Sequence, residues 1–212
     1  MSRPLIIGHR GFAARFPDNS LDGVCAALAV GADGVEVDAR PCAEGVWVCH
    51  HDRSRGGRLI AEWPLAALGR DGVPTLAEVV AEVPEQRWLF VEIKPLALEA
   101  LAQGVAELRG LLQRRARFTR MLSSSLTILA LVGAELPQVA RSWVVGDMPA
   151  APPAAGIELS PRHTLVEELL DWRLPLHPWT VNVGSRLRRL AALGVASLTS
   201  NRPDLAVEVL RG

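Results

Sequence analysis

Short β-branched runs alternate with Ala- and Leu-rich stretches along almost the whole chain. This alternation is typical of α/β proteins, in which helices connect the strands of a largely parallel sheet. Strands are predicted at Leu5–His9, Gly34–Asp38, Val46–His51, Leu89–Lys94, Arg120–Ser124, Ala140–Val145, Gly156–Leu159, His177–Val181 and Ser197–Ser200. Helices are predicted at Leu21–Val30, Leu76–Val83, Glu99–Arg114, Leu126–Ala134, Thr164–Trp172, Ser185–Leu193 and Pro203–Leu210.

One of these strands does not fit a parallel arrangement. The connection 39–45 contains Pro41 and Gly45 and is too short for a helical crossover, so Val46–His51 should return antiparallel as a hairpin arm. Eight parallel strands then remain, which is the strand count of a (β/α)₈ barrel. We therefore expect an α/β fold, a TIM-type barrel with a hairpin after strand two. A single domain over residues 1–212 accommodates this length.

Charge and hydropathy patterns exclude several classes of partner. Basic and acidic residues number 23 each and form no basic block, so neither nucleic acid nor an anionic membrane is indicated as a partner. Apolar runs are short and interrupted, so we expect no membrane anchor. Residues 1–4 lead into a strand without a signal-peptide pattern, and the cytoplasm is the simplest expected location. The three cysteines lack Cys-x-x-Cys spacing, which argues against a disulfide framework or a zinc site.

Polar residues gather at the carboxyl ends of the predicted strands, where barrel enzymes carry their chemistry. Residues two apart on a strand point the same way, so the acidic pair on strand two shares a face, as do the acid and the lysine on strand three. The residues in question are His9 and Arg10 on strand one, Glu36 and Asp38 on strand two, His51 on the hairpin, Glu92 and Lys94 on strand three, and Trp179 on strand seven.

These residue types together indicate a phosphate chemistry. Carboxylates that are crowded together repel one another unless a cation joins them, and oxygen ligands suit a hard divalent ion such as Ca²⁺ or Mg²⁺. Arg10 and Lys94 would face an anion shared with that metal, and a phosphate fits this demand. His9 and His51 could serve as general acid and general base near neutral pH. The residues alone therefore indicate metal-assisted cleavage of a phosphate ester.

The ordered set of motifs resembles the glycerophosphodiester phosphodiesterase family from Ile6 to Asp204. No single triplet is specific, whereas the whole set at these spacings is. The motifs are His9-Arg10-Gly11, Pro17-Asp18-Asn19-Ser20, Glu36-Val37-Asp38, His51-Asp52, Val91-Glu92-Ile93-Lys94, Trp179-Thr180-Val181-Asn182, and Gly194-Val195 followed by Ser200-Asn201-Arg202-Pro203-Asp204.

The resemblance implies a reaction and a role for each residue. A glycerol hydroxyl of the substrate would attack phosphorus, the head-group alcohol would leave, and the cyclic phosphate would be hydrolysed to glycerol 3-phosphate. Asp52 would orient an imidazole or a loop, and His50 should point away from the site. Glu36, Asp38 and Glu92 would bind one divalent cation, Ca²⁺ or Mg²⁺, and His9 and His51 would be the acid and the base. Arg10 and Lys94 would bind the phosphate. Trp179 would either form a floor for glycerol or serve only in barrel packing.

Two departures from the family pattern stand out. The usual Pro-Glu-Asn-Thr is replaced by a motif with Asp18 and Ser20, which could alter the brace on Arg10. The segment Arg53–Val73, where many members carry a longer cap insertion, is short here. We call it the cap segment and expect it to leave an open pocket.

Three alternative functions stay open at this point. The phospholipase D toxins that cleave sphingomyelin share the histidine pair and the acidic metal ligands. A non-catalytic phosphate- or metal-binding barrel would need no acid–base pair, so both histidines argue against it. A sugar-phosphate isomerase or lyase would usually carry a Gly-rich phosphate loop after strand seven or eight, which is lacking here. Fold alone does not exclude this last alternative.

Overall fold

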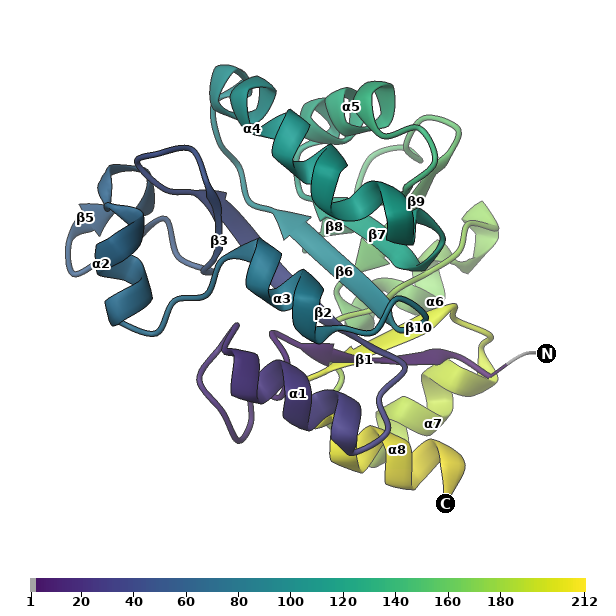
Figure 1. Cartoon of the computed structure of the whole chain (residues 1–212). Coiled ribbons are helices and arrows are strands. Elements are labelled where there is room, and N and C mark those ends of the chain that lie inside the picture. The colour runs from purple at the N-terminus through teal and green to yellow at the C-terminus, as the bar shows by residue number, and fades with distance from the viewer. Residues whose placement is uncertain (1–2) are drawn as a thin grey trace.

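The computed structural model describes residues 3–212 and consists of a curled sheet surrounded by helices (Figure 1). The parallel strands follow the order β10-β1-β2-β6-β7-β8-β9, and each neighbouring pair on this path is parallel. The strands are β1 (Leu5–His9), β2 (Gly34–Pro41), β6 (Trp88–Ile93), β7 (Thr119–Ser123), β8 (Ala140–Val145), β9 (Ile157–Pro161) and β10 (Ser197–Ser200).

An irregular segment, residues 175–181, fills the eighth position between β9 and β10. The backbone N–H of His177 donates to the carbonyl of Leu159 (2.8 Å), and that of Val181 donates to Thr199 (2.9 Å). Two prolines interrupt this segment, and proline has no N–H for the ladder. The prediction of a regular strand at His177–Val181 is therefore wrong, whereas the TIM-type barrel is confirmed.

The antiparallel hairpin is also confirmed. Strand β3 (Trp47–Cys49) pairs antiparallel with β2, with Ala39 opposite Cys49. Its Trp47 is fully buried and donates its indole N–H to the carbonyl of Gly104 (2.9 Å). A Cβ at Gly104 would lie 2.6 Å from this indole nitrogen, so the helix approaches the hairpin only because the residue is glycine.

The cap segment forms a small unit at the left of Figure 1. The sequence predicts no helix or strand in this segment. It holds the two-stranded ribbon β4 (Ser54–Arg55) and β5 (Arg58–Leu59), a 3₁₀ turn (Ile60–Glu62) and α2 (Leu65–Arg70). Its own core joins Ile60, Leu68 and Val73 to Cys42 and Val48 near the hairpin. The cap segment is thus short but packed.

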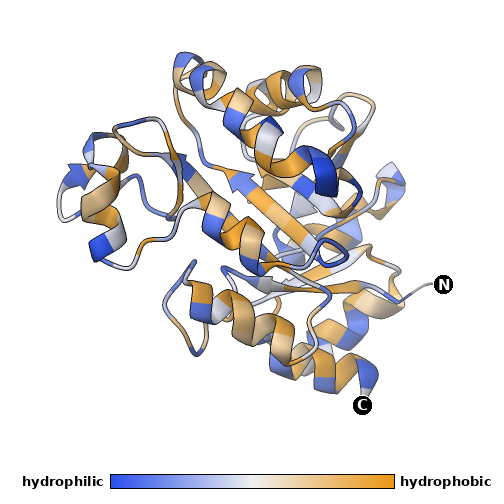
Figure 2. Cartoon of the chain, in the orientation of Figure 1, coloured by the Kyte–Doolittle hydropathy of each residue, from blue (hydrophilic) through white to orange (hydrophobic). Residues whose placement is uncertain are grey.

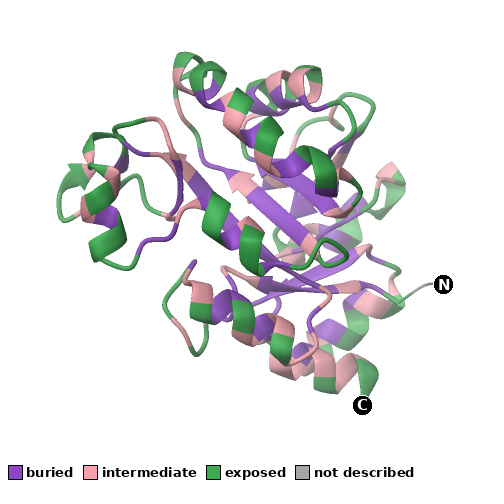
Figure 3. Cartoon of the chain, in the orientation of Figure 1, coloured by how far each residue is buried: buried purple, intermediate pink, exposed green. Residues whose placement is uncertain are grey.

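The helices that cover the sheet turn their apolar faces inward and their polar faces outward, as Figures 2 and 3 show. Ser20 caps the first of them by accepting from the N–H of Gly23. The predicted helix Thr164–Trp172 is instead broken, since 3₁₀ turns flank a single short α-helical turn. No helix in residues 3–212 is long and apolar enough to cross a membrane. The helices are α1 (Leu21–Ala29), α3 (Leu76–Glu82), α4 (Leu98–Leu112), α5 (Leu126–Glu135), α6 (Val166–Leu169), α7 (Gly184–Ala192) and α8 (Pro203–Arg211).

A buried charged network occupies the interior near the amino ends of the strands. We call Arg120, Glu158 and His177 the lower network. Arg120 pairs with Glu158 (2.6 Å) and lies over the rings of Trp88 and Phe90, 5.3 and 5.0 Å from their centroids. Glu158 also accepts from Nε2 of His177 (2.9 Å). The charges of one cation and one carboxylate therefore offset each other beside a neutral imidazole, although Nε of Arg120 has no hydrogen-bond partner among the described residues.

Candidate active site

The register of the sheet brings the predicted residues to one rim. His9 lies opposite Glu36 across β1 and β2, and Asp38 lies opposite Glu92 across β2 and β6. Asp38 is almost fully buried. The other predicted residues surround a cavity of about 200 Å³, whose lining includes His9, Arg10, Glu36, His51, Glu92, Lys94 and Trp179.

Three carboxylates face one another at this rim. Glu36, Asp38 and Glu92 each place one oxygen within 4.8 Å of the others. Burial, together with the charges of Asp38 and Glu92, raises the pKa of Glu36 well above its usual range. Among residues 3–212, Oε1 of Glu36 is buried and has no hydrogen-bond partner. A hard divalent cation fits this oxygen-only, uncompensated set.

The two cations of the site contact these carboxylates. Nζ of Lys94 lies 2.8 Å from Asp38 and 2.9 Å from Glu92, so the acid and the lysine of strand three share a face as predicted. Nε of Arg10 lies 3.1 Å from Asp38. Burial alone would raise the pKa of Asp38, but Lys94, a hydrogen bond from Asn19 and Arg10 lower it. Neither Lys94 nor Arg10 forms an ion pair with Glu36 through its side chain. The nearest basic side-chain group to Glu36 is Nε2 of His9, at 3.9 Å.

Residues before α1 hold Arg10 and Asp38 in place. Asn19 has a left-handed backbone (φ 62°), which asparagine tolerates. Its side-chain N–H donates to Oδ2 of Asp38 (3.0 Å). Its side-chain oxygen Oδ1 accepts from the backbone N–H of Asp38 (2.9 Å). Asp18 bonds Nη1 of Arg10 (2.6 Å), so the shorter side chain still braces the arginine. In the sequence, Asn19 stands only as part of the quoted motif, with no role of its own.

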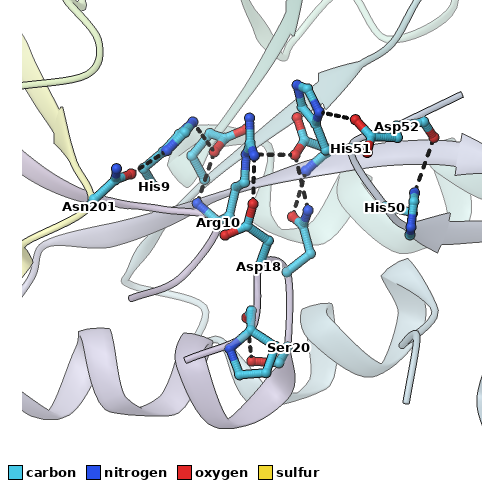
Figure 4. Close-up of polar contacts among 12 residues, drawn as sticks. His9, Arg10, Asp18, Ser20, His50, His51, Asp52 and Asn201 are labelled. Atoms are coloured by element: carbon cyan, nitrogen blue, oxygen red, sulfur yellow. Dashed lines mark hydrogen bonds and ion pairs between the residues drawn. The ribbon is translucent and has the colours of Figure 1, made fainter. Parts of the chain in front are cut away.

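A second asparagine orients His9, as Figure 4 shows. Nδ1 of His9 lies 2.6 Å from Oδ1 of Asn201, which can only accept, so the ring proton sits on Nδ1. Nε2 therefore keeps its lone pair and lies 3.9 Å from Glu36. Burial, with the charge of Arg10, lowers the pKa of His9 to about 4. His9 is thus neutral at neutral pH, in the form that accepts a proton.

His51 lies on the opposite side of the cavity and is more open. Its side chain is 40% exposed, and its Nδ1 lies 2.8 Å from Oδ1 of Asp52. This hydrogen bond lowers the pKa of Asp52. Asp52 is thus placed to orient the imidazole, as the sequence suggested. His50 instead bonds the carbonyl of Asp52 (3.0 Å) and does not line the cavity with His51.

Two further side chains differ in their relation to the cavity. Trp179 lines it together with Leu122 and Val144, and donates its indole N–H to the carbonyl of Ser160 (2.7 Å). An apolar floor at this place is compatible with both interpretations of Trp179. Cys49 is buried, and burial raises the pKa of its thiol, which argues against a thiolate nucleophile.

Comparison with known proteins agrees with this geometry. The model of the glycerophosphoryl diester phosphodiesterase family matches residues 9–101, a range that contains every predicted ligand and acid–base residue but not Trp179. A probable glycerophosphodiester phosphodiesterase 1 of Mycobacterium tuberculosis is 41% identical over 70 residues. That match covers 31% of this chain and 26% of the relative, so it spans about a quarter of the relative's length.

More distant similarities extend over the whole chain. A glycerophosphodiester phosphodiesterase of Caldanaerobacter subterraneus is 22% identical and covers 99% of this chain and 98% of its own length. The crystal structure of a putative glycerophosphoryl diester phosphodiesterase from Silicibacter pomeroyi superposes with a TM-score of 0.82 at 24% identity, covering 99% of this chain and 93% of that one.

A phosphodiesterase of Oleispira antarctica, solved in complex with the product sn-glycerol-3-phosphate, superposes with a TM-score of 0.84 at 21% identity. The superposition covers 99% of this chain and 98% of that chain. The family model over residues 9–101, the relatives and the solved structures all indicate the glycerophosphodiester phosphodiesterase family, which this chain resembles in sequence and in fold.

Proposed function

We propose that this chain hydrolyses glycerophosphodiesters to glycerol 3-phosphate and an alcohol, with the help of one divalent cation. The observation that carries this proposal is the uncompensated carboxylate set, placed in one cavity with two cations and two histidines. A site that only bound phosphate would need the cations but not an acid–base pair. The product complex of the Oleispira antarctica protein supports the same product here.

Glu36, Asp38 and Glu92 would hold the cation. Their oxygens suit Ca²⁺ or Mg²⁺, and the unpartnered Oε1 of Glu36 gives the site a donor that no side chain uses. When bound, such a cation stabilises negative charge on the phosphoryl oxygens and acidifies a nearby hydroxyl.

His9 and His51 would move the protons. Nε2 of His9 takes the proton of the glycerol hydroxyl as its oxygen forms the new bond to phosphorus, because Asn201 already holds the other ring nitrogen. His51 gives its proton to the leaving alcohol oxygen as the old P–O bond breaks. Asp52 accepts from Nδ1 of His51 and so orients the imidazole for this step. Water then opens the cyclic phosphate with the two roles reversed.

Arg10 and Lys94 would bind the phosphate. An ammonium group has three N–H donors, and Lys94 uses two of them on Asp38 and Glu92, which leaves one for a phosphate oxygen. Arg10 lines the same cavity. Trp179 would support the apolar face of glycerol. Cytoplasmic location and a single domain over residues 1–212 also remain predictions.

Turnover assays test this function directly. Purified protein should release glycerol 3-phosphate from glycerophosphocholine or glycerophosphoethanolamine with Ca²⁺ or Mg²⁺, and a chelator should abolish the release. Absence of turnover with several diesters and both metals would favour the binding barrel. Cleavage of sphingomyelin in preference to the glycerophosphodiesters would favour the phospholipase D-like alternative.

A further inference from the structure

A second cavity, of about 600 Å³, lies beside the rim and outside the candidate active site. Residues 40–41, 53, 59–61, 95–97 and 100 line it, and we call it the rim groove. These segments follow Asp38, His51 and Lys94 in the chain, where β2, the hairpin and β6 end. The groove is therefore built where three strands of the proposed active site finish, between the cap segment and the start of α4.

The walls of the rim groove are mostly apolar, but two arginines interrupt them. Leu59, Ile60 and Leu96 supply apolar surface, and Arg40 and Arg53 supply positive charge. No ion pair in the part of the chain that the structure describes includes either arginine. An apolar groove with two uncompensated guanidinium groups favours an occupant that combines an apolar stem with a negative group.

Arg40 connects the rim groove to the proposed chemistry. It lies two residues after Asp38 on β2, so it continues the face that carries Glu36 and Asp38. Its Nε donates to the carbonyl of His51 (3.0 Å). His51 is the proposed donor of a proton to the leaving oxygen. His51 itself does not line the rim groove, so Arg40, which lines the groove and bonds the backbone of His51, is the link between the two.

A different cavity has His51 in its lining but makes no comparable demand for charge. It measures about 310 Å³, and its lining includes Asp18, Asp52 and Asp71. Each of these carboxylates already has a partner: Asp18 pairs with Arg10, Asp52 with His51, and Asp71 with Arg55. Their charges are therefore paired within the protein, whereas neither arginine of the rim groove forms an ion pair among the described residues.

We propose that the rim groove binds the leaving alcohol and selects alcohols that carry a negative charge on an apolar stem. This inference rests on the proposed function, since it concerns the leaving side of the same reaction. The carboxylate or phosphate at the end of the stem contacts Arg40 and Arg53, and the stem lies on the apolar walls.

Three glycerophosphodiesters that differ in charge alone test the inference. Their leaving alcohols are hexanol, hydroxyhexanoate and aminohexanol, which have similar stems and are neutral, anionic and cationic. We expect kcat/KM to be about fivefold higher for hydroxyhexanoate than for hexanol, as a partly exposed ion pair allows, and lowest for aminohexanol. Added salt should reduce this ratio, because it screens exposed charges.

Arg53→Gln should lower the ratio, because only Arg40 then remains to contact the anion, and Arg70→Gln is the matched control. Arg70 lies on α2 in the same cap segment, has the same charge and does not line the groove. Arg40→Gln should lower the ratio too, and it should also slow all three substrates because Arg40 supports His51. Equal kcat/KM values for the three diesters, or a ratio unchanged by Arg53→Gln, would overturn the inference. No turnover of any diester would instead reject the proposed function itself.

Discussion

Two groups of buried charges occupy the barrel interior, and they differ in charge balance. At the amino ends, the lower network matches Arg120 against Glu158 and holds His177 between Glu158 and Ser197. At the carboxyl ends, three carboxylates meet the cations Arg10 and Lys94, and an oxygen of Glu36 has no partner among the described residues.

The difference separates a structural role from a binding role. Buried charges are costly unless they are paired, so a compensated group needs nothing further. A group that keeps an unpaired buried oxygen beside a cavity is stabilised by a ligand that supplies the missing charge. We therefore expect changes at Arg120 and Glu158 to affect stability, and changes at the rim to affect activity, whereas His177 also lines the cavity and can affect both.

The largest expected effect concerns the two histidines of the rim. His9→Ala and His51→Ala should each lower kcat by about 10²–10⁴, the usual contribution of a general acid or base. Steady-state kinetics with glycerophosphocholine measure this, and circular dichroism should show an unchanged fold. A loss below tenfold in either variant would exclude that histidine as an acid or base.

Matched Glu→Gln substitutions in the lower network and at the rim test the difference in charge balance most directly. Glu158→Gln leaves Arg120 buried without its partner and should lower the free energy of unfolding by about 3–5 kcal/mol. Glu36→Gln relieves carboxylate repulsion, so the metal-free protein should become more stable while its affinity for Ca²⁺ or Mg²⁺ falls. Urea unfolding and calorimetric metal titration separate the two outcomes. A loss of stability in both variants would show that the rim is compensated as well.

The lower network should also make stability depend on pH. Burial lowers the pKa of His177 to about 4, despite its hydrogen bond to Glu158. The unfolded chain, with an ordinary pKa of about 6.5, binds the proton first, so stability is complete above pH ~6.5 and falls as the pH drops towards ~4. The loss is on the order of 3 kcal/mol at the lower end.

His177→Gln should flatten this dependence. Urea unfolding at about pH 7 and about pH 5 would show a smaller difference in the variant than in the wild type, with the remainder arising in part from His9, whose pKa burial also lowers to about 4. An identical difference in both proteins would mean that His177 does not titrate as its surroundings imply.

The smallest expected effect concerns Lys94, the only lysine in the sequence. Lys94→Arg keeps the charge but replaces a compact ammonium, bonded to two carboxylates, with a planar fork. We expect kcat/KM to fall by about tenfold, because the fork cannot repeat both contacts at the same place. The chain has no other lysine at which a control Lys→Arg substitution could be made. Lys94→Met therefore serves as the reference and shows the effect of losing the charge completely. Wild-type kinetics in Lys94→Arg would show that compactness is unimportant.

Much of the fold could be predicted because hydrophobic periodicity is local. The seven parallel strands that form, the antiparallel hairpin and the meeting of Glu36, Asp38 and Glu92 follow from alternation and from the rule that strand ends share a rim. The cap segment could not be predicted, because its short elements depend on a core shared with Cys42 and Val48 rather than on their own pattern.

Contacts that depend on closure of the barrel were also beyond the sequence. Asn201 bonds His9 across 192 positions, and only the pairing of β1 with β10 brings them together. The prolines of segment 175–181 leave a strand position without a regular strand, which β-propensity alone cannot indicate. Asn19 gave a possible signal, since it lies between Asp18 and Ser20 in the quoted motif, but its contact with Asp38 is tertiary.

The bond between His9 and Asn201 has a consequence for how the protein matures. It joins the first strand to the turn after the last one, so it belongs to the contacts of highest sequence separation, which are slow to form because a long loop must close first. The pairing of β2 with β6 spans a much shorter stretch of chain and can bring the three carboxylates together earlier. We therefore expect a refolding chain to regain the capacity to bind a metal before it regains turnover, with a delay between the two that reports when its ends meet.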